Sequence, residues 1–308
     1  MKPALSALFS LTAQAMAANP VFPGADPHAS LIDGTLWIHP TRSKGGDNFM
    51  AFSSKDLVHW QNHGPILDFK DIPWVSADGR AEHGAWAPCL IPKDGKYYFY
   101  FSVGPQDATH PSRIGVAVGD SPAGPFKDSG KMLLTGGSGF EAIDPMVFID
   151  PADKRPLLYA GGSAGAKLRV FELKPDMISI LREIKVETPP QFTEGVFIHH
   201  HGSLYHLTYS HGNFRDATYS VHYATSTSAT GPWSYRGVLL KSDGHHQGPG
   251  HHSVVEDSKL GTLIVYHRWE QEGPGPYQGS RQIAIDRISY DADGFLKPVT
   301  QTNEGVIR

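Results

Sequence analysis

Three carboxylates occupy comparable places along the chain: Asp26, Asp144 and Glu194. Each stands at the head of an apolar run and is followed directly by Pro or Gly. Such dipeptides also start turns, so a purely structural role would explain any one of them. Three acids at matching positions favour a shared function instead. Carboxylates that converge suit acid–base chemistry, because burial and mutual repulsion drive their pKa values apart.

The matching positions belong to a segment that recurs five times. A small or polar pair opens each copy, and an apolar run, a turn and a second apolar run follow. The copies begin at Asp26, Ala87, Asp144, Glu194 and His251. Their mean spacing of about 56 residues is typical of repeat architectures. Each period contains short aromatic and β-branched runs and no helical pattern. The sequence therefore predicts an all-β fold, a five-bladed β-propeller in which each blade is a four-stranded antiparallel sheet.

The repeat also predicts where the acids meet. The innermost strand of each propeller blade lines the central channel, so equivalent positions form a ring at one mouth. We expect Asp26, Asp144 and Glu194 to face one cavity there, with His251 beside or below them.

The 308 residues fit one propeller. Residues 1–17 have a charged start, a short apolar run and a small-residue cleavage pattern, which predict a signal peptide. Residues 18–308 are then a single catalytic domain. Residues 176–185 alternate apolar side chains and are expected to form an outer strand, and residues 283–288 are expected to complete the last blade.

Composition excludes several classes of protein. The formal net charge of −4 lacks the basic excess of a nucleic-acid-binding protein. The apolar part of the leader is too short to span a bilayer, so we expect no membrane partner and a secreted or periplasmic location. Cys89 is the only cysteine, which rules out an intrachain disulfide and predicts a buried core residue. We expect a monomer.

Five motifs in order resemble glycoside hydrolase family 43. They are Ala25-Asp26-Pro27, Trp86-Ala87-Pro88, Ile143-Asp144-Pro145, Thr193-Glu194-Gly195 and the run from Gly248 to Ser253. The match extends from about Asn19 to the C-terminus. It implies a five-bladed propeller that hydrolyses arabinose- or xylose-containing oligosaccharides and polysaccharides with inversion of configuration.

The resemblance also implies roles for single residues. Asp26 resembles the general base and Glu194 the general acid, while Asp144 resembles the carboxylate that orients the acid and raises its pKa. Trp86 resembles a wall of the sugar pocket, although core packing would also explain a tryptophan there. His267 and Arg281 resemble substrate-binding positions that reach the pocket from the last blade.

Histidines supply the only suggestion of a metal. His251 resembles a channel histidine beside a bound cation, often calcium, and no organic cofactor is implied. Calcium prefers oxygen ligands, so a hydrogen-bonded structural histidine is the open alternative. Residues 199–201 are three consecutive histidines, for which we expect a solvated turn rather than a metal site. The role of His245 and His246 stays open.

We expect an exported, exo-acting α-L-arabinofuranosidase, with β-xylosidase activity as a possible addition. The alternatives within the family are a β-xylosidase and an endo-arabinanase. Some xylosidases of the family carry a C-terminal β-sandwich over the pocket, and no such segment follows here, which favours arabinofuranosides. A fructan-active propeller is disfavoured because Ala25 and Ile143 precede the two Asp-Pro pairs. From another class, a non-catalytic sugar-binding propeller would not need three acids.

Overall fold

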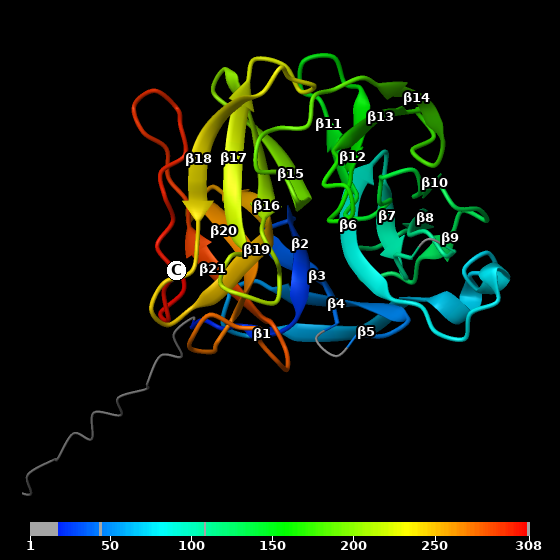
Figure 1. The fold of residues 1–308 in the computed structure, drawn as a ribbon, viewed down its shortest axis with the longest axis horizontal. Coiled ribbons are helices and arrows are strands. Elements are labelled where there is room, and N and C mark those ends of the chain that lie inside the picture. The colour runs from blue at the N-terminus through cyan, green and yellow to red at the C-terminus, as the bar shows by residue number, and fades with distance from the viewer. Residues whose placement is uncertain (1–17, 43–44, 108, 307–308) are drawn as a thin grey trace, which may run out of the picture.

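The computed structural model describes residues 18–42, 45–107 and 109–306. The predicted signal peptide, residues 1–17, lies outside the described residues. Five small antiparallel sheets stand around a central channel, which is the predicted five-bladed propeller (Figure 1). No helix in the described part of the chain is long and apolar enough to cross a membrane.

The first four blades follow one another along the chain. The first consists of β2 (Ala25–Ile32), β3 (Thr35–Thr41), β4 (Asn48–Ser54) and β5 (Gln61–Asp68). The second consists of β6 (Ala85–Lys93), β7 (Lys96–Val103), β8 (Arg113–Gly119) and β10 (Leu134–Thr135), with β9 (Lys127–Asp128) also paired to β8. The third consists of β11 (Met146–Ile149), β12 (Pro156–Ala160), β13 (Arg169–Leu173) and β14 (Ile180–Ile184). The fourth consists of β15 (Glu194–His201), β16 (Leu204–His211), β17 (Ser220–Ser226) and β18 (Ser234–Leu240). The outer strand predicted within residues 176–185 is therefore confirmed as β14.

The fifth blade is built from both ends of the chain. It consists of β19 (Gln247–Asp257), β20 (Gly261–Trp269), β21 (Gln282–Arg287) and β1 (Phe22–Pro23). The expectation that residues 283–288 complete this blade is wrong, since β21 is the third strand and β1 pairs along it as the fourth. The Asn19 side chain extends the pairing: its Oδ1 accepts the Ile285 N–H at 2.8 Å and its Nδ2 donates to the Ile285 carbonyl at 3.1 Å.

Buried polar rings join neighbouring blades. In each of the first three blades, a ring on the second strand donates to a backbone carbonyl of the next blade. His39 Nε2 bonds Pro122 O at 2.8 Å, while the hydroxyls of Tyr100 and Tyr159 donate to the carbonyls of Met177 and Ala229. Without these bonds, each buried ring group and its carbonyl would have no hydrogen-bond partner. The bonds therefore fix how adjacent sheets pack against each other. Cys89 is buried, as predicted.

One segment between blades contains short helices. Between β5 and β6 the chain forms the 3₁₀ turns η1 (Phe69–Asp71) and η2 (Ser76–Asp78). Long loops also join β7 to β8, β16 to β17 and β20 to β21. All of these segments leave or enter strands on the face where the inner strands begin. That face therefore carries the irregular structure from which a site can be built.

Candidate active site

The five repeat positions share an unusual backbone conformation at the channel mouth. Their φ angles lie in the left-handed region: Asp26 46°, Ala87 41°, Asp144 55°, Gly195 63° and His251 38°. The ring thus contains Gly195, and Glu194 precedes it by one residue, which corrects the predicted alignment. Glu194 therefore stands where Trp86 stands in the second blade, since each comes directly before a ring residue. Both side chains nevertheless reach the same cavity.

Each ring N–H is held by a side chain from the preceding blade. Ala87, Asp144 and His251 donate to the hydroxyls of Thr41, Ser102 and Ser210, at 2.7, 2.9 and 2.9 Å respectively. The Asp26 N–H donates to His267 Nδ1 at 3.0 Å. In the fifth blade, His267 therefore has the role that Thr41, Ser102 and Ser210 have in other blades, which is to accept the N–H of a ring residue. It is fully buried and lies behind Asp26 rather than on the cavity wall where we expected it.

The fourth blade departs from this pattern in an informative way. Thr41, Ser102, Ser210 and His267 each face the residue before the ring position across the first strand pair of their own blade. In the third blade Gly161 occupies that place, because its N–H bonds Ile143 O, and it has no side chain to offer. The Gly195 N–H instead donates to Asp144 Oδ2 at 2.9 Å. Because Gly161 has no side chain to accept the Gly195 N–H, Asp144 accepts it and is thereby bonded to the residue that follows Glu194.

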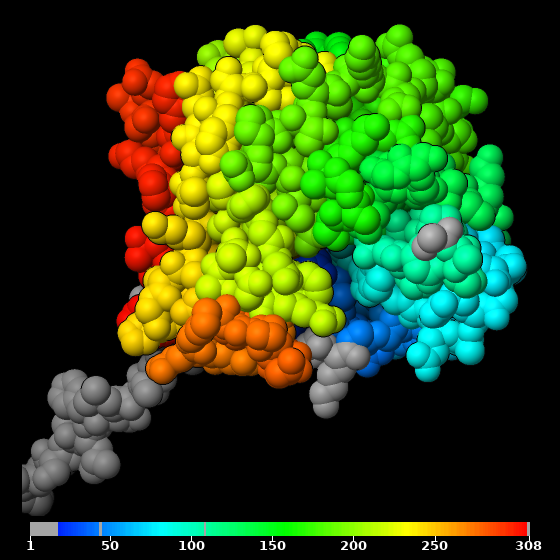
Figure 2. Space-filling model, viewed as in Figure 1, coloured from blue at the N-terminus to red at the C-terminus, as the bar shows by residue number. Residues whose placement is uncertain are grey.

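These residues open into a cavity of about 430 Å³. Figure 2 shows this face hollowed near its centre, where dark blue atoms of the first blade lie beneath green and cyan ones. Four of the side chains on its wall are the three acids and His251. The full lining is Asp26, Trp86, Gln106, Ile143, Asp144, Ser163, Glu194, Phe214, Arg215, His251 and Arg281. The three predicted carboxylates therefore face one cavity.

Asp26 is held in its ionised form. Its Oδ1 accepts a hydrogen bond from Arg281 Nη1 at 2.9 Å, and His251 Nδ1 lies 3.5 Å away. Burial alone would raise the pKa of Asp26, but Arg281, His251 and His267 together hold that pKa well below its usual range. Burial lowers the pKa of His251, and the charge of Asp26 opposes that shift. Asp26 is thus ionised at neutral pH.

Glu194 has the opposite electrostatic environment. Burial, together with the negative charge of Asp26, raises the pKa of Glu194 to about 7, although its Oε1 accepts the Tyr219 hydroxyl at 2.8 Å. Burial and the charges of Glu194 and Asp26 also raise the pKa of Asp144. Burial therefore favours the protonated form of at least one of these two acids. Because Asp144 already accepts the Gly195 N–H, the geometry favours the proton on Glu194.

Two glycines seat the Trp86 ring against backbone. A Cβ placed on Gly84 would come within 2.3 Å of the indole, and one on Gly104 within 2.1 Å. The Gly104 N–H also bonds Gly84 O at 2.9 Å, which closes this platform. The indole is half-buried and lines the cavity, so it forms a flat wall of the site rather than part of a core. A flat aromatic face suits the apolar C–H face of a sugar ring.

Loop residues that no motif marked complete the cavity. Phe214 and Arg215 come from the loop between β16 and β17. The end of β20 and the loop after it hold this loop: Trp269 Nε1 donates to Phe214 O at 2.8 Å and the Tyr277 N–H to Arg215 O at 2.6 Å. The Arg281 guanidinium lies 5.0 Å from the Phe214 ring centre. Only the length of these segments signalled a functional role in the sequence.

The donor set does not fit a calcium ion held by protein ligands. The site offers His251 and carboxylates that are already engaged, whereas calcium takes six to eight oxygen ligands. Within the described ranges, no group of three or more His, Cys, Asp or Glu side chains is arranged to hold a metal ion. His251 Nδ1 instead lies between Asp26 and Asp144, 3.5 Å from Oδ1 of the first and 3.6 Å from Oδ2 of the second.

The other histidines lie outside the cavity. Residues 199–201 end β15 and are half-buried rather than a solvated turn, because His201 stacks on Tyr290 at 3.6 Å between ring centres and His199 stacks on His206 at 5.0 Å. His246 Nδ1 bonds Asp243 at 2.9 Å and its Nε2 bonds Asn303 at 2.9 Å. It therefore secures a loop to the C-terminal segment.

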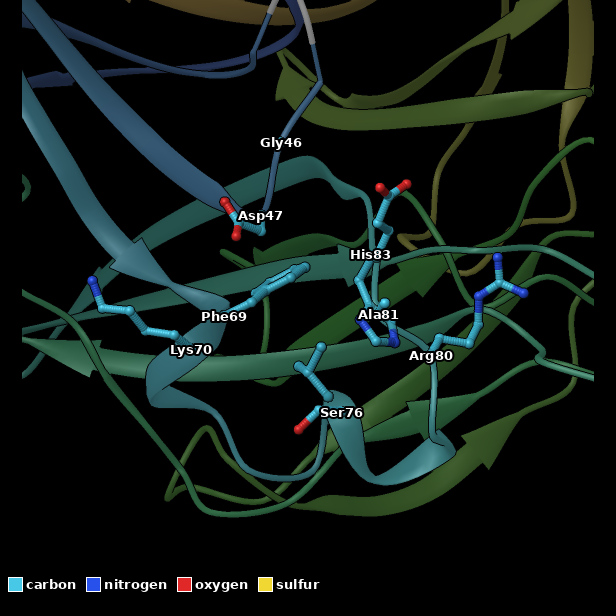
Figure 3. A pocket seen from close by; sticks show the side chains of 10 residues that line it. Gly46, Asp47, Phe69, Lys70, Ser76, Arg80, Ala81 and His83 are labelled. Carbon is cyan, nitrogen blue, oxygen red and sulfur yellow. The ribbon is translucent and has the colours of Figure 1, made fainter.

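A second cavity lies on the same face between the first and second blades. It measures about 440 Å³, and its wall comes from the β3–β4 loop and from the segment with η1 and η2 (Figure 3). Asp47, Lys70 and Arg80 surround it from different sides, and His83 bonds Asp78 at 3.0 Å. Asp26, Asp144 and Glu194 do not line this cavity, so the acid–base chemistry belongs to the first one.

Removing the charge of Asp144 is expected to shift the pH profile. Without that negative neighbour the pKa of Glu194 falls, so in Asp144→Asn the acid loses its proton at a lower pH. The alkaline limb of kcat/KM therefore moves towards acid, and activity above that limb drops about tenfold for each pH unit of the shift. Profiles of both proteins from pH 4 to 9 measure this. An unmoved or alkaline-shifted limb would contradict the proton assignment.

Two carboxyl groups in one polar cavity, one with a lowered pKa and one with a raised pKa, are what the acid–base hydrolysis of glycosides needs. Comparison with known proteins agrees. The sequence profile of glycosyl hydrolases family 43 matches residues 17–296. A β-D-galactofuranosidase of Aspergillus niger is 36% identical over 324 residues, which cover 99% of this chain and 91% of that protein. The chain belongs to glycoside hydrolase family 43 and is a glycoside hydrolase.

Other relatives have different specificities. An arabinoxylan arabinofuranohydrolase of Bacillus subtilis is 31% identical over 92% of this chain and 63% of that protein. Among solved structures, a family 43 β-xylosidase/α-arabinofuranosidase from a compost microbial metagenome, in complex with xylotriose and in calcium-free form, superposes with a TM-score of 0.75. It is 27% identical and the match covers 92% of this chain and 98% of that one. These relatives support an enzyme over a non-catalytic sugar-binding propeller.

Proposed function

We propose that the protein is an exo-acting, inverting α-L-arabinofuranosidase that acts on neutral arabinose-containing oligosaccharides. The observation that carries this proposal is that Asp26 and Glu194 line one cavity of about 430 Å³, with the pKa of Asp26 held low and that of Glu194 raised to about 7. This volume lies near the lower end of the ~300–1,000 Å³ typical of small-molecule sites, which favours a terminal sugar over a long stretch of polymer. The similarity to the arabinofuranohydrolase of Bacillus subtilis supports arabinofuranose as the sugar that is released.

The proposed mechanism is a single displacement. Asp26 takes a proton from a water molecule, whose oxygen then forms a bond to the anomeric carbon. Glu194 gives its proton to the glycosidic oxygen as the bond between that oxygen and the anomeric carbon breaks. The products are a free sugar of inverted configuration and a shortened alcohol. Arg281 keeps Asp26 ionised before the step, Tyr219 donates to Glu194, and Asp144 holds the N–H of the next residue, Gly195.

A β-D-galactofuranosidase is the second candidate. The Aspergillus niger relative of 36% identity carries that activity in its name. The two sugars are close in shape: β-D-galactofuranose matches α-L-arabinofuranose around the ring and has one additional hydroxymethyl carbon on its exocyclic chain. Discrimination then depends on the space beyond that exocyclic chain, where a single added carbon changes affinity by roughly 10–200-fold. β-Xylosidase and endo-arabinanase activities are the remaining alternatives.

Two further proposals accompany this function. We propose export to the periplasm or medium on the basis of residues 1–17, and a monomer. A calcium ion at His251 has its support in the resemblance to the family and in the metagenomic relative, which is described as a calcium-free form. The mechanism above uses no metal, because the residues around His251 do not provide the oxygen ligands.

Activity on a panel of aryl glycosides tests the proposal. We expect hydrolysis of 4-nitrophenyl α-L-arabinofuranoside, with kcat/KM at least tenfold above that for the β-D-galactofuranoside and the β-D-xylopyranoside. NMR of the first product formed is expected to show the inverted anomer. A preference for the galactofuranoside would replace the first candidate by the second, and a retained anomer would refute the single displacement.

A further inference from the structure

Glu194 is held by a tyrosine that does not line the catalytic cavity. Tyr219 directly precedes β17, at the end of the loop that joins β16 to β17. Its hydroxyl donates to Glu194 Oε1 at 2.8 Å. The tyrosine is fully buried and is not among the residues of the cavity wall. It therefore contacts the acid from within the protein.

Two contacts with the fifth blade fix the Tyr219 ring. The ring lies parallel to that of His267, with 5.7 Å between ring centres and 8° between ring planes. Gly250 leaves space for it, since a Cβ at that position would come within 2.2 Å of the tyrosine ring. The ring cannot shift without displacing these neighbours, so the hydroxyl stays at Glu194.

The Ser210 hydroxyl sets the direction of the hydrogen bond to Glu194. Ser210 lies opposite Glu194 in the β15–β16 pair, and its Oγ accepts the His251 N–H at 2.9 Å. A backbone N–H can only donate, so Ser210 keeps its own proton for the hydrogen bond that it makes with Tyr219. Burial raises the pKa of Tyr219 well above its usual value, and the phenol therefore keeps the proton that it donates to Glu194.

One oxygen of Glu194 is left for the substrate. Oε1 accepts the Tyr219 hydroxyl, and no hydrogen bond reaches Oε2 from any residue in the described ranges. An oxygen that already accepts a hydrogen bond is the poorer place for the acidic proton, which favours Oε2. When that proton leaves, Glu194 becomes a carboxylate, and the hydrogen bond from Tyr219 becomes stronger because its acceptor is charged. The contact therefore stabilises the transition state more than the ground state.

We propose that Tyr219 is a positioning residue of the reaction: it keeps the transferable proton on Oε2 of Glu194 and stabilises the carboxylate that remains after the transfer. The inference rests on the proposed function, in which Glu194 protonates the leaving group. The bond between Oε2 and hydrogen breaks as a bond between hydrogen and the glycosidic oxygen forms. The electron pair stays on Glu194, where the Tyr219 hydroxyl meets the new charge. Ser210 supports this contact from behind.

Tyr219→Phe tests the proposal, because it keeps the ring against His267 and Gly250 and removes only the hydroxyl. On a neutral arabinose-containing trisaccharide we expect kcat to fall about 10–100-fold, the effect of one hydrogen bond to a charged group. KM is expected to stay the same, since Tyr219 does not line the cavity. On 4-nitrophenyl α-L-arabinofuranoside kcat is expected to change little, because that leaving group departs without a proton. A merely structural defect would lower both activities alike.

Tyr159→Phe is the matched control. Tyr159 is as fully buried as Tyr219, and its hydroxyl donates to the Ala229 carbonyl rather than to a residue of the site. Both variants lose one buried hydrogen bond, so we expect similar falls in unfolding temperature. Only Tyr219→Phe should change the kinetics.

The pH profile supplies an independent measurement. The hydrogen bond from Tyr219 favours the carboxylate form of Glu194, so its loss raises the pKa of Glu194. The alkaline limb of kcat/KM in Tyr219→Phe is therefore expected to move to higher pH, opposite to the shift expected for Asp144→Asn. Burial and the nearby charges also act on this pKa, and both variants of tyrosine leave them in place. Those charges belong to Asp26, Arg281, Glu141 and the coupled Asp144.

Ser210→Ala tests the start of the donor chain without changing Tyr219. A tyrosine that no longer accepts from Ser210 is a weaker donor, so we expect kcat on the trisaccharide to fall about 2–10-fold, with little change on the nitrophenyl glycoside. Equal losses on the two substrates, or an alkaline limb of Tyr219→Phe that stays in place or moves towards acid, would overturn the inference and leave the proposed function intact. A wild-type enzyme inactive on every aryl glycoside and neutral oligosaccharide would overturn both.

Discussion

Replacing Glu194 by alanine is expected to lower kcat/KM on natural oligosaccharides by about 10²–10⁴-fold. The departing sugar alkoxide needs a proton, and Glu194 supplies it because burial and neighbouring charge raise its pKa to about 7. A nitrophenolate leaves readily without a proton. The loss on 4-nitrophenyl glycosides should therefore be smaller than the loss on oligosaccharides by at least tenfold. Steady-state kinetics on both substrate types measure the difference.

Glu194→Gln is the matched control for this result. The amide keeps the size of the side chain and can still accept the Tyr219 hydroxyl, but it has no acidic proton to give. It should share the leaving-group dependence of the alanine variant. Equal losses on oligosaccharides and nitrophenyl glycosides in both variants would show that Glu194 is not the general acid.

The repeat period made the acid ring predictable. A propeller places one residue of each blade at the channel mouth, so spacing alone brings Asp26 and Asp144 together. The one-residue error at Glu194 has a physical cause. The ring position requires a left-handed backbone, and in the fourth blade Gly195 satisfies that requirement at no steric cost. A sequence pattern of acids does not reveal which residue of a Glu-Gly pair has the positive φ.

Contacts between blades were beyond the reach of the sequence. His267 matched a family position and was expected on the pocket wall, yet its place is fixed by the need to bond the Asp26 N–H. Gly161 carries no signal at all, although its missing side chain leaves the Gly195 N–H to Asp144. The closing strand β1 is two residues long and has no periodicity to detect. Such features depend on which chain segments meet, and no local pattern encodes them.

The two acids are matched to their roles by position within one repeat. Asp26 occupies the ring itself, where Arg281 and His251 approach it and keep its pKa low. Glu194 precedes the ring by one residue and faces Tyr219 and the charge of Asp26, with no cation within salt-bridge distance among the described residues. The one-residue offset therefore separates the two pKa values. The ring position of the first blade holds the base, Asp26, and the position before the ring in the fourth blade holds the acid, Glu194.

Replacing Asp26 by asparagine is expected to lower kcat/KM by about 10²–10⁴-fold on every substrate. Water must lose its proton whatever group departs, so oligosaccharides and nitrophenyl glycosides should lose activity to the same extent. Asparagine is the suitable replacement because it tolerates the left-handed φ of 46° better than alanine does. Its Oδ1 can still accept the Arg281 hydrogen bond of 2.9 Å.

The comparison of the two variants decides the assignment of acid and base. Circular dichroism of Asp26→Asn should match the wild type, since the backbone and the hydrogen bond to Arg281 are kept. A loss that shrinks on nitrophenyl glycosides would assign the acid role to Asp26 and reverse the mechanism. If the losses are equal for Asp26→Asn and unequal for Glu194→Ala, water activation and leaving-group protonation belong to separate carboxylates, as the opposite shifts of their pKa values require.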